Sequence, residues 1–265
     1  MIFKLFKFIR KEGFSKIGPR VKCELFKFFH NSQQILSKEY VLSRYGIMFK
    51  KNWKDQTFRF YINASYGYFF WNFLSDISYN FVFIDIGTNQ GLYTICAAKN
   101  KFCSEVYSFE PINSTFSLLA KNVFINKVSK KCRLLKKAVS DQTGTLDLSI
   151  KDNHSGAATI RLGCRAEGYL KKETIETVDQ IVLNNLINNN KIFPIVLKID
   201  VEGHEETVIN TLIKSNFFKR VKIIFYEVDE NWVNPKKLED LLKKNGFTKF
   251  LKKGNGSHYD VLAKR

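Results

Sequence analysis

Two carboxylates stand at the ends of two consecutive apolar runs in this sequence. Asp85 follows the run FVFI and opens the glycine loop DIGTNQG, residues 85–91, while Glu110 ends the run VYSF. Gly87 and Gly91 would allow a bound molecule to approach the backbone closely. A carboxylate beside a pyrophosphate would cost several kcal/mol at short range, so the loop favours a ligand of the opposite charge.

A dinucleotide site would need the spacing GxGxxG, but Asn89 stands where the middle glycine would be. S-adenosylmethionine carries a sulfonium, an ammonium and a nucleoside without a phosphate, and it fits this loop better. Glu110 could accept both hydroxyls of a ribose, a feature that NAD sites share. Taken together, the loop and the second acid favour S-adenosylmethionine over a nicotinamide dinucleotide. An ordinary strand-to-helix turn would explain the glycines but not the second acid.

A second group of polar residues lies in the segment LKIDVEGHE, residues 197–205. An acceptor hydroxyl becomes nucleophilic as its proton departs, and histidine can take a proton near neutral pH. We therefore predict His204 as the general base, with Asp200 and Glu202 beside it. The alternative is that the acids only complement the positive end of the following helix, with His204 exposed. Asp200, at a buried strand end, needs a partner in either case.

Oxygen ligands from Asp200, Glu202 and Glu227 could together hold a divalent cation. No spacing in the sequence requires this, and no metal is predicted. His154, in the polar loop DNHSG, is a candidate lid facing the acceptor, while His30 and His258 are assigned to the surface or to packing. The aromatic run over residues 66–71 is assigned to the core.

The elements that must position these residues form an alternating pattern after residue 80. Apolar strand runs alternate with segments of helical spacing, which predicts an α/β fold with helices on both faces of a mostly parallel sheet. A seven-stranded sheet ending in an antiparallel hairpin is expected. Its strands are FVFID, EVYSFE, CRLLKKAVS, PIVLKID, VKIIFYEV, FTKFLKK and SHYDVLAK. An inserted stretch from TLDLSI to ETIETVD should lie near the carboxyl edge, where ligands bind in such sheets.

The first part of the chain has a different sequence pattern. Residues 1–75 are expected to form a basic N-terminal extension of helices and a hairpin, and residues 76–265 the main domain. Within the extension, alternation over Tyr45–Ile62 predicts a hairpin that includes TFRFYI, and the segment SYGYFFWNFLSDIS predicts a buried helix.

The motifs DIGTNQG, SFEP, AVSD and LKIDVEGHE resemble, in this order, those of the FkbM-type methyltransferase family, which has the Rossmann-like class I methyltransferase fold. The resemblance covers roughly residues 80–230. It implies S-adenosylmethionine-dependent O-methylation of sugars, glycans or hydroxylated natural products. It also implies a donor site in which the loop lines the methionine, Glu110 holds the ribose and the segment 138–140 flanks the adenine. The donor-site residues are Asp85, Gly87, Thr88, Asn89, Gly91, Glu110, Pro111, Val139 and Ser140.

The charge of the chain leaves the partners open. Lys and Arg number 43 against 25 acids, a formal net charge of +18, which attracts phosphates, anionic lipid or acidic glycans alike. A sugar or glycan hydroxyl is the expected acceptor. A nucleic-acid methyltransferase is the alternative, disfavoured because no motif for base methylation or RNA-binding module is present. A basic membrane-peripheral binding module that kept the fold without activity is a third interpretation, disfavoured by the intact donor carboxylates.

The localisation expected from the sequence is cytoplasmic. Five cysteines, odd in number and without a CxxC pair, indicate reduced thiols. Residues 1–11 place basic side chains on one side of a helix and apolar ones on the other. This pattern is typical of a helix in an anionic membrane interface, and equally of one docked on its own domain. The oligomeric state and the identity of the acceptor are not predicted.

Overall fold

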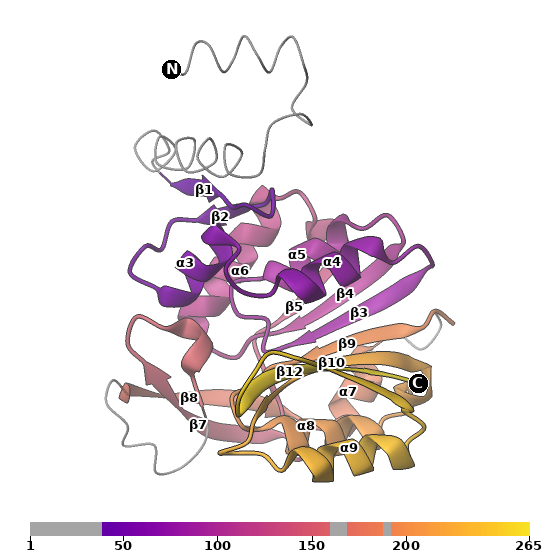
Figure 1. Ribbon diagram of the computed structural model, residues 1–265. Coiled ribbons are helices and arrows are strands. Elements are labelled where there is room, and N and C mark those ends of the chain that lie inside the picture. The colour runs from indigo at the N-terminus through magenta and orange to yellow at the C-terminus, as the bar shows by residue number, and fades with distance from the viewer. Residues whose placement is uncertain (1–38, 160–168, 188–191) are drawn as a thin grey trace.

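The computed structural model of the chain describes residues 39–159, 169–187 and 192–265, and its largest element is a seven-stranded sheet (Figure 1). Every pairing within the sheet is parallel except those of the strand β12, which runs antiparallel to both of its neighbours. The mostly parallel sheet with a closing antiparallel hairpin is thereby confirmed. Across the sheet, its strands are β11 (Lys249–Lys253), β12 (His258–Lys264), β10 (Val221–Asp229), β9 (Ile195–Ile199), β3 (Phe81–Ile86), β4 (Cys103–Phe109) and β5 (Cys132–Leu135).

Helices cover both faces of this sheet, with α4 and α5 on one side and α8 and α9 on the other (Figure 1). Most of them follow the apolar spacing of the sequence, and α9 starts with Pro235 behind the capping side chain of Asn234. The helices are α3 (Gln56–Asn63), α4 (Tyr68–Asp76), α5 (Leu92–Lys99), α6 (Asn113–Ile125), α7 (Gln180–Leu186), α8 (Glu205–Ile213) and α9 (Pro235–Lys244), with short 3-10 turns η2 (Ser129–Lys131), η3 (Ser155–Ala157) and η4 (Phe218–Arg220).

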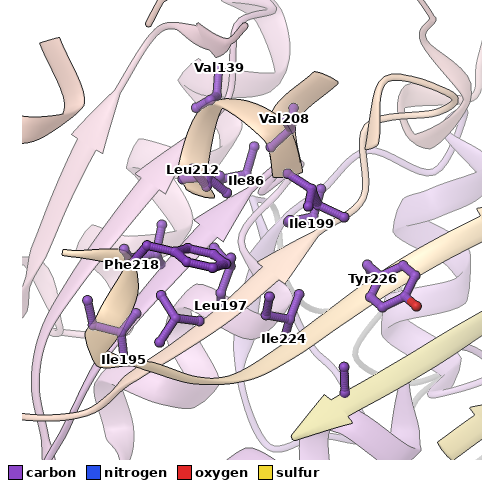
Figure 2. Close-up of a cluster of buried hydrophobic side chains, with 14 of the residues drawn as sticks. Ile86, Val139, Ile195, Leu197, Ile199, Val208, Leu212, Phe218, Ile224 and Tyr226 are labelled. Carbon is purple, nitrogen blue, oxygen red and sulfur yellow. The ribbon is translucent and has the colours of Figure 1, made fainter. Parts of the chain in front are cut away.

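The strand side chains divide between two hydrophobic cores because successive residues of a strand point to opposite faces. In β3, Ile84 and Ile86 join the core beneath α8 and α9, shown in Figure 2, while Phe81 and Phe83 join the core beneath α4 and α5. All six residues of β3 are buried, as a central strand covered on both faces requires.

Two smaller sheets flank the main one. The hairpin of β1 (Tyr40–Leu42) and β2 (Met48–Lys50) packs its residues into the same core as α4 and α5. The predicted insertion forms a three-stranded sheet in the order β6 (Ala138–Val139), β8 (Tyr169–Val178), β7 (Gly144–Lys151). In the sequence, this inserted sheet lies between β5 and β9, the third and fourth parallel strands, as predicted.

Three sequence predictions need correction. TFRFYI is not a strand but most of α3, because Asp55 caps that helix at the backbone N–H of Phe58 and because Phe58, Tyr61 and Ile62 are buried at helical spacing. The run CRLLKKAVS is not one strand, since β5 ends at Leu135 and the next pairing, in β6, is with β8. The helix α4 is only partly buried, with Phe70 and Leu74 as its buried residues.

Several predictions lie outside the described residues. They concern the amphipathic pattern of residues 1–11, His30, Cys23 and Cys164. Cys96, Cys103 and Cys132 are described and are free thiols. Among the helices of the described ranges, none combines the length and the apolar character needed to cross a membrane.

Candidate active site

A cavity of about 410 Å³ lies at the carboxyl ends of the parallel strands and collects most of the predicted site residues. It is bounded by the loop after β3, the ends of β4, β9 and β10, the helix α3 and the inserted sheet. Of the predicted residues, those in its wall are Gly87, Asn89, Glu110, Pro111, Val139, Asp200, Glu202 and His204. Asp85, Thr88, Gly91 and Ser140 lie behind this wall.

The loop after β3 has a backbone that only certain residues allow. Gly87 has φ +74°, and a Cβ atom there would stand 1.8 Å from the carbonyl oxygen of Asp200. Gly91 has φ +95°, and a Cβ would stand 2.7 Å from Leu119. The hydroxyl of Thr88 donates to the carbonyl of Asp85 at 2.9 Å and closes the turn. The glycines therefore serve the packing of the loop against its neighbours as well as any approach of a ligand.

Glu110, predicted to hold the ribose of the donor, lies in the cavity wall at the end of β4. Its Oε2 accepts from the backbone N–H of Asn89 at 2.9 Å, and its Oε1 accepts from the N–H of Ile112 at 3.1 Å. Burial raises the pKa of Glu110 to about 7, although these two hydrogen bonds oppose the rise. A carboxylate offers about four acceptor positions, so Glu110 could still accept the hydroxyls of a ribose.

Asp85 does not face the cavity. Its side chain is fully buried, accepts from the hydroxyl of Thr94 at 2.7 Å and lies 3.7 Å from Nζ of Lys198. Lys198, the last residue but one of β9, also contacts Asp200 at 3.2 Å and donates to the carbonyl of Gly87 at 2.6 Å. Burial lowers the pKa of Lys198, but Asp200 and Asp85 raise it more, so the ammonium stays charged beneath the glycine loop.

Three carboxylates gather at the other end of the cavity. One oxygen each from Asp200, Glu202 and Glu227 lies within 4.8 Å of the others. Burial, followed by the charges of Glu227 and Asp200, raises the pKa of Glu202 well above its usual range. Groups arranged in this way bind protons or cations in preference to anions.

The turn that presents Glu202 is held by its neighbours. Glu202 has φ +50°, and its carbonyl accepts from the hydroxyl of Thr159 at 2.7 Å. Glu205, only 1% exposed, accepts from the backbone N–H of Val201 at 3.1 Å and of Gly203. Glu205, the first residue of α8, therefore fixes the turn before that helix, and Glu205 and Glu206 lie in its first turn, where acids complement the positive helix end.

His204 lines the cavity, and its Nε2 lies 3.1 Å from Oγ of Ser140. Ser140 directly follows β6, so this contact joins the turn before α8 to the inserted sheet. Pro111 and Val139 are apolar residues of the cavity wall.

Two residues of the cavity wall, and one residue that is hydrogen-bonded to the wall, were not identified from the sequence. His258, assigned to the surface or to packing, lines the cavity with Nε2 2.7 Å from Oε1 of Glu227. Tyr66, assigned to the core, also lines it and donates to Asp200 at 3.5 Å. Asp55 binds the backbone N–H of Ser155 at 2.8 Å and the amide of Gln90 at 3.0 Å, connecting α3, the inserted loop and the donor loop. His154, predicted to face the acceptor, does line the cavity.

The chain is similar to known methyltransferases. The profile of the methyltransferase FkbM domain matches residues 85–249. Hexuronic acid methyltransferase AglP of Haloferax volcanii is 27% identical over 183 residues, which cover 68% of this chain and 69% of that relative.

Solved structures are similar at lower identity. The human methyltransferase 10 domain containing protein is 12% identical with a TM-score of 0.50, covering 94% of this chain and 98% of that chain, and bears on the fold alone. Methyltransferase FkbM from Methylobacillus flagellatus KT is 10% identical with a TM-score of 0.46, covering 69% of this chain and 43% of that chain. Because the family profile matches more than half of the sequence, the chain belongs to the FkbM methyltransferase family and is a methyltransferase.

Proposed function

We propose that this chain transfers a methyl group from S-adenosylmethionine to a hydroxyl of a sugar or glycan. The observation that carries the proposal is a cavity with two differently equipped ends. One end has the glycine loop and Glu110, and the other has the carboxylates of Asp200, Glu202 and Glu227. A donor and an acceptor could therefore meet inside one enclosed space, as methyl transfer requires.

The donor end suits S-adenosylmethionine in shape and chemistry. Glu110 would hold the ribose hydroxyls, and the apolar side chains of Ile112, Val139, Leu148 and Ile175 would contact the adenine. The donor would supply an electrophilic methyl group on a positively charged sulfur. The backbone of the loop at Gly87, fixed from below by Lys198, would orient its amino-acid part.

The acceptor end suits an uncharged hydroxyl. A sugar hydroxyl must lose its proton during transfer, and burial raises the pKa of Glu227 to about 8, close enough to neutrality for its carboxylate to take that proton. The relative whose name says that it methylates hexuronic acid supports a carbohydrate as the acceptor. The acidic wall disfavours the close approach of a nucleic-acid phosphate, which speaks against the alternative suggested by the net charge.

The test combines donor binding with product analysis. Calorimetry should detect S-adenosylmethionine binding to the wild-type chain, and Glu110→Ala should weaken it while NADH and ATP bind neither protein. Labelled methyl groups should then enter the glycan fraction of the cell envelope of the source organism. Labelling of RNA alone, with unlabelled glycan, would refute the proposal.

A further inference from the structure

An imidazole–carboxylate pair forms part of the cavity wall where β10 and β12 meet. Glu227, near the carboxyl end of β10, is 6% exposed, and His258 is the first residue of β12. The distance from Nε2 of His258 to Oε1 of Glu227 is 2.7 Å. Strand pairing alone does not produce this contact, since the register sets His258 opposite Asp229 and Glu227 opposite Asp260.

The pair joins the inside of the cavity to its surroundings. The side chain of Glu227 is 8% exposed and lies with Asp200 and Glu202 at the acceptor end, whereas the side chain of His258 is 56% exposed. A charged carboxylate in such a buried position needs a partner that stays charged or donates a hydrogen bond. His258 provides both when it is protonated.

We propose that Glu227 is the general base of the methyl transfer and that His258 is a positioning residue that keeps Glu227 ionised; this rests on the function proposed above. The acceptor oxygen forms a bond to the methyl carbon while the bond from that carbon to sulfur breaks, leaving a neutral thioether. The hydroxyl proton moves to Glu227 and leaves to water after the product departs. The methyl group, the proton and the positive charge of the sulfonium are then all accounted for.

The charges around the pair agree with these roles. Burial and the charge of Asp200 raise the pKa of Glu227, while His258 lowers it. The hydrogen bond to Glu227 raises the pKa of His258, against the effect of its partial burial, and Asp229 adds to the rise. The other titratable or charged groups that interact with Glu227 are Tyr66, Lys198, Asp200, Glu202 and Glu205, and Asp260 interacts with His258.

His204 is the competing base, and its position differs. Its Nε2 lies 3.1 Å from Oγ of Ser140, in the segment that the family resemblance sets beside the adenine. Glu227 instead lies with Asp200 and Glu202 at the acceptor end of the cavity. If His204 were the base, the acidic limb of the rate profile would follow His204 and not Glu227. The limb would then not respond to a change at His258.

The first test needs no acceptor. In the full chain, NMR should show His258 titrating well above the usual histidine pKa of about 6.5, and Glu227→Gln should return it towards that value. The variant should keep the circular dichroism spectrum of the wild-type chain. A His258 pKa that stays unchanged in Glu227→Gln would overturn the pairing.

The second test follows transfer of labelled methyl groups to the glycan fraction as a function of pH. Glu227→Gln should lower kcat by about 10²–10⁴-fold at every pH, the usual contribution of a general base. His258→Gln should move the acidic limb of the profile to higher pH. At pH values below the limb, the rate should then fall roughly tenfold for every pH unit by which the limb moves. A purely structural role of His258 would not move this limb.

Matched variants separate the alternatives. Glu239→Gln, on the exposed side of α9, makes the same chemical change away from the cavity and should leave the profile unaltered. His204→Gln should reduce the rate less than Glu227→Gln; the reverse order would overturn the proposal.

Activity that EDTA abolishes and Mg²⁺ restores would also overturn it, because the carboxylates would then bind a metal. If the wild-type chain labels no glycan, the proposed function fails, while the NMR titration still decides whether the pair exists.

Discussion

The replacement of Lys198 by methionine is the strongest test of how the donor loop is supported. Nζ of Lys198 lies 3.7 Å from Asp85 and 3.2 Å from Asp200, and only 3% of the side chain is exposed. At an effective dielectric constant of about 20, charges at such distances interact by about 4–5 kcal/mol. Removing one partner of a buried pair typically costs about 3–5 kcal/mol because the other charge is left uncompensated. We therefore expect Lys198→Met to lower the free energy of unfolding by about 3–5 kcal/mol.

The loss should depend on pH, and its sign follows from Asp85. Burial raises the pKa of Asp85, and the loss of Lys198 would raise it further. A carboxyl group whose folded pKa is raised stabilises the fold while it is protonated and loses that contribution as the pH rises through its folded pKa. Urea unfolding followed by circular dichroism should therefore show a larger loss at pH 8 than at pH 5.

Two companion variants decide the interpretation. Adding Asp85→Asn to Lys198→Met should restore part of the lost stability, since the buried charge is then gone. Lys243→Met, which removes an exposed lysine paired with Glu239 on α9, should leave the unfolding midpoint nearly unchanged. A loss below about 1 kcal/mol in Lys198→Met, without dependence on pH, would refute the reasoning.

Three further predictions concern the donor end. Gly87→Ala should abolish donor binding and lower the Tm more than Gly46→Ala does. Both glycines have positive φ, but only at Gly87 would a Cβ atom stand 1.8 Å from a carbonyl oxygen, that of Asp200. Equal losses of Tm in the two variants would contradict the close approach. The pKa of Glu110 is raised to about 7 from an ordinary 4.5, so this carboxyl stabilises the fold below pH 4.5 and loses that contribution as the pH rises to 7. Glu110→Gln should therefore flatten the profile of Tm against pH. An unchanged slope in the variant would exclude this carboxyl as the source. Asp55→Ala should lower the free energy of unfolding by about 1–2 kcal/mol through the lost helix cap and speed hydrogen exchange at Ser155, while wild-type exchange there would argue against the proposed bridge.

The sheet could be predicted from the sequence because local pattern decides it. β3, β4, β9 and β10 are apolar runs that end in polar residues, and each is covered on both faces as such runs require. The strand prediction for TFRFYI was wrong because six residues of mixed polar and apolar character fit both a strand and a helix. The deciding feature was Asp55 before it, a helix cap whose carboxylate also binds Ser155, one hundred residues later in the chain.

The site was predictable as a group of motifs but not in its pairings. The orientation of Asp85 depends on Lys198, and a lysine inside the apolar run IVLKID was the available signal, since a buried ammonium requires acidic partners. His258 had no such signal. Its position follows from the antiparallel register of β12 on β10, a long-range property that no local pattern contains.

The positions of Lys198 and Asp85 change the physical argument for the ligand. The buried ammonium of Lys198 compensates the charge of Asp85, so this acid alone does not decide between a cationic and an anionic donor. The carboxyl groups in the cavity wall are those of Glu110 at one end and of Asp200, Glu202 and Glu227 at the other. A pyrophosphate spanning the cavity would lie between two acidic ends, whereas a sulfonium between them would be attracted to both. The preference for a phosphate-free, positively charged donor therefore rests on the two ends of the cavity rather than on the glycine loop.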